Sequence, residues 1–291
     1  MSSCRLPSER FWNAGGGLVL FVWLVLLGDW GSLGRMGMAQ EKSAGNDWET
    51  LFERNEFQGS AGEQLRYRLL RPAKIVSGER YPLVIFLHGA GERGDDNRAQ
   101  LVHGMREFAR PDRREKFPAF VLAPQCPRDQ KWVDVAWDAP RHERPEAAAP
   151  ALQMCQELVE QLQSDLPIDD ARIYLTGLSM GGFGTFDALA RWPDHFAAAI
   201  PICGGGDSRP EQVGRFREVP LWVFHGARDN IVRPERSREM VDALKAAGGA
   251  PRYTEYPDAG HDSWTATYAD EAVFAWLFAQ RRGAAEPNPD K

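Results

Sequence analysis

The sequence is poor in cysteine and has no block of basic residues. Its 291 residues contain four cysteines, and none lies in a Cys-x-x-Cys pair or beside histidines at zinc-binding spacing, so we expect no structural metal. Lysine and arginine are spread along a chain of net charge −6, without the basic stripe that marks nucleic-acid-binding proteins. We therefore set nucleic acid aside as a partner and expect neither a metal nor a cofactor.

The chain also lacks an apolar run long enough to span a membrane. The stretch Ala14 to Gly28 is shorter than the roughly 20 apolar residues that a spanning helix needs. It follows Arg5 and Arg10 and precedes Gly37-Met38-Ala39, which is the layout of a secretory signal peptide with a small-x-small cleavage site. We predict a signal peptide over residues 1–39, a secreted or periplasmic protein, and no stable membrane insertion after cleavage. An uncleaved anchor is the alternative.

Cleavage at this site would remove Cys4 and leave three cysteines, Cys126, Cys155 and Cys203. An odd number in an exported protein leaves at least one thiol free. Cys155 falls in a helical pattern and is expected to be buried. The sequence leaves open whether Cys126 and Cys203 form a disulfide, and it does not indicate the oligomeric state.

Apolar runs alternate with helical patterns from residue 83 to the end of the chain. Runs typical of buried strands lie at 83–87, 119–123, 173–178, 196–203, 221–224 and 252–256. Helical spacing lies at 99–108, 147–164, 180–192, 234–247 and 264–280. This alternation predicts an α/β fold, a doubly wound and mostly parallel sheet in a single catalytic domain over residues 40–282.

Three further segments complete this organisation. Loose alternation over 51–57 and 64–70, with glycines between them, predicts an N-terminal hairpin of edge strands. Residues 128–146 have little periodicity and predict a long loop, and loops of that length are often functional. The acidic, proline-bearing end, 283–291, is predicted to be a disordered tail.

The chain is organised around one serine between a predicted strand and a predicted helix. Gly177-Leu178-Ser179-Met180-Gly181 fits the Gly-x-Ser-x-Gly pattern of a nucleophile elbow, in which a strained turn projects the serine from the carboxyl edge of the sheet. The glycines allow strand and helix to approach without Cβ clashes. A glycine-rich turn that merely contains a serine is the alternative, so the surrounding residues must decide.

Two other loops that follow predicted strands carry Asp229 and His261. The carboxyl ends of parallel strands meet at one edge of a sheet, so both should face Ser179. Serine needs a base within hydrogen-bond reach, and the base needs an acid to fix its tautomer. The order Ser, Asp, His is the one found in α/β hydrolases. Asp207 and Asp258 are competing acids. Asp207 is less favoured because it follows the strand one earlier than expected, and Asp258 because it lies too close in sequence to His261 to sit opposite it.

Acyl transfer also needs amide donors for the oxyanion. The amide of Met180, directly after the serine, is one candidate, and that of Ala90, in the glycine-rich loop after residue 87, is the other. His88 is an alternative base, but we expect it to support this loop by hydrogen bonding. His225 is expected to be structural in the same way.

These motifs resemble a known superfamily. The segments 87–94 and 177–182 together with Gly260-His261 are similar to the α/β hydrolases, and more narrowly to the lidless carboxylesterases and predicted peptidases related to the phospholipase/carboxylesterase family, dienelactone hydrolase and the prolyl oligopeptidase catalytic domain. The resemblance covers about residues 50 to 280. It implies nucleophile, acid and base roles for Ser179, Asp229 and His261, and oxyanion roles for Ala90 and Met180.

The resemblance implies a serine hydrolase that cleaves carboxylic esters through an acyl-enzyme intermediate, and the predicted signal peptide implies that it is exported. A serine peptidase of the prolyl oligopeptidase type, acting on short peptides, is the first alternative. It ranks second because no N-terminal propeller is evident in the sequence. A noncatalytic binding module on the same fold is the other alternative.

Three tryptophans suggest the kind of ester. Trp132 and Trp137 lie in the long loop, and Trp264 lies three residues after His261, so we expect indole rings to flank Ser179. Flat apolar faces at a crevice suit a sugar ring or an aryl acid, which favours small-molecule or acylated saccharide esters as substrates. The alternative is that these tryptophans are packing residues.

Overall fold

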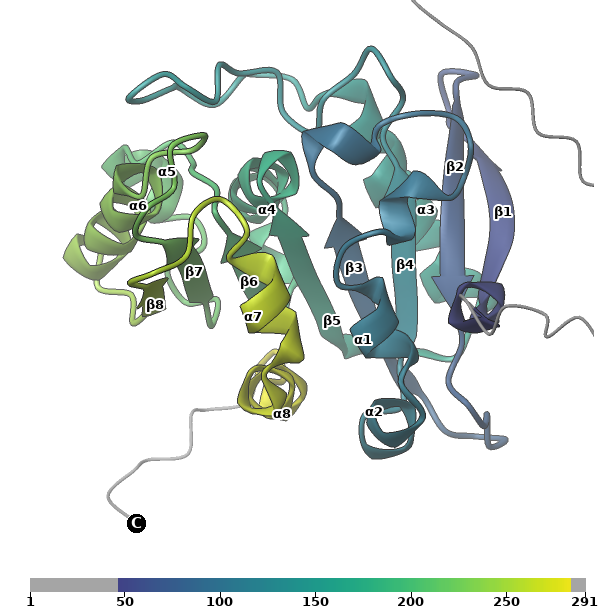
Figure 1. Ribbon diagram of the computed structural model, residues 1–291. Coiled ribbons are helices and arrows are strands. Elements are labelled where there is room, and N and C mark those ends of the chain that lie inside the picture. The colour runs from purple at the N-terminus through teal and green to yellow at the C-terminus, as the bar shows by residue number, and fades with distance from the viewer. Residues whose placement is uncertain (1–46, 284–291) are drawn as a thin grey trace, which may run out of the picture. The chain divides into compact units, whose positions relative to one another are not determined.

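The computed structural model describes residues 47–283, in which one eight-stranded sheet lies between two layers of helices (Figure 1). The strands are β1 Phe52–Gln58, β2 Gln64–Leu70, β3 Tyr81–Leu87, β4 Phe120–Gln125, β5 Ile168–Leu178, β6 Ala198–Ile202, β7 Trp222–Gly226 and β8 Arg252–Tyr256. Their order in the sheet is β1-β2-β4-β3-β5-β6-β7-β8, antiparallel from β1 to β4 and parallel from β4 to β8. The predicted doubly wound, mostly parallel sheet is confirmed. The predicted signal segment and residues 284–291 of the predicted tail lie outside the described residues.

Helices cover both faces of the sheet. They are α1 Met105–Ala109, α2 Pro111–Lys116, α3 Pro150–Asp165, α4 Met180–Arg191, α5 Pro210–Val213, α6 Glu235–Ala246, α7 Trp264–Ala269 and α8 Glu271–Ala279. Within the described part of the chain, none of them is long and apolar enough to cross a membrane.

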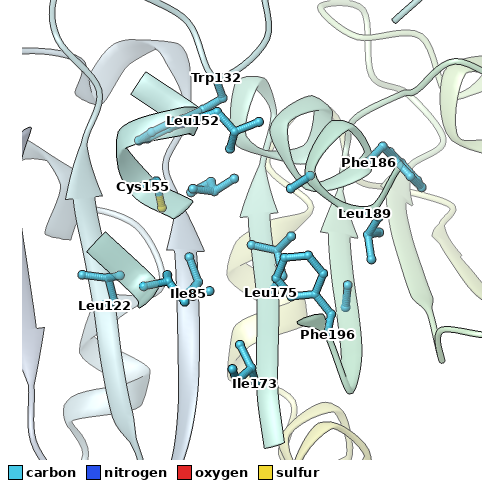
Figure 2. Packing of buried hydrophobic residues seen from close by; sticks show 14 of the residues in the cluster. Ile85, Leu122, Trp132, Leu152, Cys155, Ile173, Leu175, Phe186, Leu189 and Phe196 are labelled. Carbon is cyan, nitrogen blue, oxygen red and sulfur yellow. The ribbon is translucent and has the colours of Figure 1, made fainter. Parts of the chain in front are cut away.

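The apolar run of β3 is continuous because both of its faces are buried. Leu83 and Ile85 pack in a cluster with residues of α3, α4 and α6, part of which is shown in Figure 2. Val84 and Phe86, which point the other way, pack with residues of α1, α7 and α8. A strand with an apolar residue at every position is what a parallel sheet covered on both sides requires.

The hairpin prediction is correct in its pairing and wrong in one part of its placement. β1 and β2 pair antiparallel, with Phe57 opposite Leu65. Of the two, only β1 lies at the edge, because β2 also pairs with β4, where Leu69 lies opposite Leu122. The burial of Leu65, Leu69 and Leu70 explains this interior position.

Two predicted helices are interrupted in the structure. The segment 99–108 is a single 3-10 turn, Ala99–Leu101, followed by α1, and Gly104 between them has a φ of 75°, outside the helical region. The segment 264–280 is divided into α7 and α8 at Asp270. The Asp270 carboxylate accepts a hydrogen bond of 2.8 Å from the amide of Ala272, which begins a new helix rather than continuing the old one.

The loop 128–146 contains no helix or strand, as predicted. The three cysteines in the described region, Cys126, Cys155 and Cys203, are buried free thiols. Burial raises the pKa of the Cys155 thiol to about 12. Cys155 therefore acts as an apolar packing residue of α3 (Figure 2).

Candidate active site

Ser179 occupies a strained turn between β5 and α4. Its φ of 52° and ψ of −118° lie outside the regions that a serine ordinarily adopts. A Cβ on Gly177 would overlap the carbonyl of Gly181, and a Cβ on Gly181 would overlap the carbonyl of Leu87. Glycine at both positions is therefore what lets α4 start directly against β5 and β3 and hold the serine in this conformation.

The structure brings Ser179, His261 and Asp229 together at the carboxyl edge of the sheet. They follow β5, β8 and β7, respectively. The Nε2 atom of His261 lies 2.9 Å from Ser179 Oγ, and its Nδ1 atom lies 2.7 Å from Asp229 Oδ2. An ionised carboxylate can only accept, so Nδ1 carries the proton and Nε2 is free to accept the hydroxyl proton of Ser179. The arrangement has the geometry of a nucleophile, a base and an orienting acid.

Asp229 is buried but well supplied with donors. Burial by itself would raise its pKa, but hydrogen bonds with His225 and His261 and from the amides of Ile231 and Val232 outweigh burial and hold the pKa well below its usual range. The two amides donate to Oδ1 at 2.8 and 3.0 Å. The carboxylate therefore stays ionised and is fixed in orientation.

His225 contributes more to this site than the sequence indicated. It is 0% exposed, and its Nε2 atom lies 2.9 Å from the carbonyl oxygen of Val232 and 3.2 Å from Asp229 Oδ2. Both of these atoms are acceptors, so Nε2 carries a proton. Nδ1 lies 2.7 Å from the hydroxyl of Ser237 on α6. The sequence feature that could have indicated this role is a single histidine in an apolar strand, four residues before Asp229.

The competing acids are engaged elsewhere. Asp207 pairs with Arg209 at 2.6 Å and accepts from the amide of Arg144 at 2.7 Å. Asp258 is exposed and pairs with Arg228 at 2.6 Å. Neither one is hydrogen bonded to His261.

His88 supports its loop, as expected. Its Nε2 atom accepts a hydrogen bond of 2.9 Å from the amide of Cys126, and Nδ1 lies 2.6 Å from the carbonyl oxygen of Gly89. Burial lowers the pKa of His88 to about 4, so the ring is neutral at physiological pH. A neutral histidine with both nitrogens engaged has no free atom with which to act as a base.

The prediction that Trp132 flanks Ser179 as a substrate platform is wrong. Its side chain is 0% exposed and packs in the core cluster, near Leu152 (Figure 2). The indole Nε1 donates a hydrogen bond of 3.0 Å to the carbonyl oxygen of His88, and the two rings meet edge to face at 5.2 Å. Trp132 therefore fixes the loop that follows β3.

Trp137 and Trp264 do line a cavity at Ser179. It has a volume of about 440 Å³, and Ser179, His261 and Ala90 also form part of its wall. Trp264 is 9% exposed and meets the His261 ring edge to face at 5.3 Å. Two of the three predicted tryptophans are thus in position to contact a ligand.

The two candidate oxyanion donors lie in the turns that follow β5 and β3. Met180 is the first residue of α4, where amides have no partner inside the helix. Ala90 begins the 3-10 turn Ala90–Glu92 and lines the cavity. Met180 directly follows Ser179, and Ala90 lines the same cavity as Ser179, so both amides remain candidates for an oxyanion site.

Among residues 47–283, one group of side chains is close enough to hold a metal. The sulfur of Cys203, a carboxylate oxygen of Asp229 and a nitrogen of His261 lie within 4.8 Å of one another. Burial raises the pKa of the Cys203 thiol, which disfavours the thiolate that a metal would need. Asp229 and His261 already bond to each other, so this donor set suits an acid–base pair better than a metal.

The fold is that of an α/β hydrolase, and Ser179 lies at its strand-to-helix turn between β5 and α4. The sequence pattern of the phospholipase/carboxylesterase family matches residues 73–274. The chain belongs to this family.

Individual relatives agree with that assignment. A crystal structure described as a thermostable esterase is 41% identical, with a TM-score of 0.74, over 81% of this chain and 64% of that one. The poly(3-hydroxyalkanoate) depolymerase C of Paucimonas lemoignei is 44% identical over 35% of this chain. The bifunctional acetylxylan esterase/xylanase of Neocallimastix patriciarum is 27% identical over 36% of it. The matches span 32% and 16% of those two proteins, so this chain spans less than two thirds of each of the three relatives.

Proposed function

We propose that this protein is a serine hydrolase that cleaves carboxylic esters through an acyl-enzyme intermediate. The observation that carries the proposal is the 2.9 Å contact between Ser179 Oγ and His261 Nε2, at a strained turn that lines a cavity. Family membership and two relatives described as esterases support the same chemistry.

In the proposed reaction, His261 takes the proton of Ser179 as Oγ attacks the ester carbonyl carbon. The amides of Met180 and Ala90 stabilise the oxyanion. His261 then gives its proton to the departing alcohol, which leaves an acyl group on Ser179. A water molecule, deprotonated by His261, attacks this acyl group and releases the acid. Asp229 holds His261 in the required tautomer throughout.

The substrate is proposed to be a small ester, including acylated saccharides. Trp137 and Trp264 offer apolar faces in the cavity, and one relative is described as an acetylxylan esterase. The predicted signal segment, residues 1–39, supports action outside the cytoplasm.

The test is Ser179→Ala, assayed on short-chain aryl esters and, in parallel, on short peptide amides. Turnover of the ester is expected to fall at least 10³-fold or so while the circular dichroism spectrum is retained. Ser60→Ala, in the turn between β1 and β2, is the matched control and should keep wild-type turnover. Faster cleavage of peptide amides than of esters would instead favour a peptidase. A failure of a fluorophosphonate probe to label Ser179 would favour a noncatalytic binding module.

A further inference from the structure

The cavity at Ser179 contains a carboxylate that the proposed ester chemistry does not use. Glu92 ends the 3-10 turn Ala90–Glu92, lines the cavity, and has a side chain that is 13% exposed. A Cβ built on Gly89 would lie 2.9 Å from Glu92 Oε2 and 3.7 Å from the Cβ of Ser179. The carboxylate therefore lies within a substrate's length of the nucleophile, although His261 already has its acid in Asp229.

This carboxylate has unused capacity to accept hydrogen bonds. The ring of His103 approaches it, with Nε2 at 3.6 Å from Oε1, which is longer than a hydrogen bond. Within residues 47–283 no side chain or amide donates to either oxygen. Glu92 is partly buried and lines the cavity, so its carboxylate is open to a group that enters there. A ligand hydroxyl can donate a hydrogen bond to it.

A continuous wall connects the base to this carboxylate. The ring of Trp264 lies 5.3 Å from that of His261 and 5.1 Å from that of His103, which in turn contacts Glu92. We call Trp264, His103 and Glu92 the alcohol wall. In ester cleavage the base passes its proton to the leaving oxygen, so the alcohol part of the substrate must lie beside His261 Nε2, where this wall begins.

We propose that the alcohol wall is a subsite for a polyhydroxylated alcohol, such as a sugar ring. Trp264 offers an apolar face to the C–H groups of the ring, and Glu92 accepts a hydrogen bond from one of its hydroxyls. A second hydroxyl of the ligand can form a hydrogen bond with His103, because a hydroxyl both donates and accepts. A ligand with an ammonium group would fit less well, because that group only donates. No lysine or arginine lines the described cavity, so an anionic alcohol lacks a counter-ion there. This inference rests on the proposed ester hydrolysis.

The test compares two acetates of primary alcohols on six-membered rings, one ring polyhydroxylated and the other a hydrocarbon. One is methyl glucoside acetylated on its primary hydroxyl, and the other is cyclohexylmethyl acetate, its carbocyclic counterpart. The quantity measured is the ratio of kcat/KM for the glucoside to kcat/KM for the carbocycle. Glu92→Met, which removes the acceptor but keeps the length of the side chain, is expected to lower this ratio roughly ten-fold or more, as for a lost hydrogen bond to a charged group.

Two other variants make the test specific. Glu92→Gln keeps a neutral acceptor and should give a ratio between those of wild type and Glu92→Met. It also replaces Glu92→Met if that variant does not fold. Asp138→Asn removes the other carboxylate from the wall of the cavity and should leave the ratio within about two-fold of wild type, because Asp138 lies outside the alcohol wall.

The two proposals fail in different ways. If the Glu92 variants keep the wild-type ratio while Ser179→Ala abolishes hydrolysis of both acetates, the subsite is refuted and the esterase stands. If the wild-type protein hydrolyses neither acetate nor an aryl ester, the proposed function itself is refuted. A ratio that falls equally in Asp138→Asn would show a general charge effect, which would also overturn the subsite.

Discussion

Replacing His88 by glutamine should change how the stability of the protein depends on pH. In the folded protein burial lowers the pKa of His88 to about 4, compared with an ordinary value of 6.5. Between these two pH values the unfolded chain binds the proton and the folded chain does not, so the free energy of unfolding falls as the pH is lowered through this window. The difference between the two pKa values corresponds to about 3 kcal/mol of folding stability. This stability is present in full above pH 6.5 and is lost by about pH 4.

The structural cause is specific to this ring. A proton on Nε2 would face the amide of Cys126, which is itself a donor, inside a packed core beside Trp132. In His88→Gln, the side-chain oxygen can accept from the same amide without a titratable group. Burial and the nearby Arg236 also lower the pKa of His142 to about 4. His142 is present in both proteins and serves as an internal reference.

The assay is urea unfolding of wild type and His88→Gln at a series of pH values from 6.5 down to 4. We expect the wild-type free energy of unfolding to fall by about 3 kcal/mol more than that of the variant across this range. The comparison uses the slope of the unfolding free energy against pH. A loss of stability that is the same at every pH, such as one from the lost ring packing, therefore does not affect it. Parallel slopes would refute the assignment of His88 as a buried neutral histidine.

Three further substitutions test the site and its support. Asp229→Asn should lower ester turnover by about 10⁴-fold with the fold intact, because the amide presents the wrong tautomer of His261, whereas Asp258→Asn, near His261 but exposed, should keep wild-type turnover. The reverse result would reassign the acid. Trp132→Phe should lower the free energy of unfolding by about 1–3 kcal/mol, because the carbonyl of His88 loses its donor, without changing the ratio of kcat/KM on the two acetates. A change in that ratio would return Trp132 to the substrate site.

Much of the architecture could be predicted because it depends on local patterns. The run Leu83 to Leu87 is apolar at every position, which in a chain of alternating strands and helices fits only a covered parallel strand. The predicted strand 252–256 matches β8 in full. The glycines at Gly177 and Gly181 pointed to the elbow because no other residue fits where β5 meets α4.

The errors have physical causes that the pattern of hydrophobicity does not contain. Gly104 and Asp270 break helices whose apolar spacing continues past them, because backbone conformation at one and side-chain capping at the other override the spacing. Trp132 and Trp137 lie close in sequence in the same loop, yet one is buried and the other lines the cavity. The side of a loop that meets the core depends on tertiary packing, and an irregular segment has no period from which to infer it.

The position of Asp229 depends on contacts that only the folded chain reveals. Asp229 receives hydrogen bonds from the amides of Ile231 and Val232, which lie in its own loop, and lies 3.2 Å from His225 in the preceding strand. Together with the 2.7 Å contact to His261, these contacts outweigh burial and hold the pKa of the Asp229 carboxyl well below its usual range. Asp229 therefore does not take up the proton that leaves Ser179. That proton stays on His261, as the proposed acyl transfer requires.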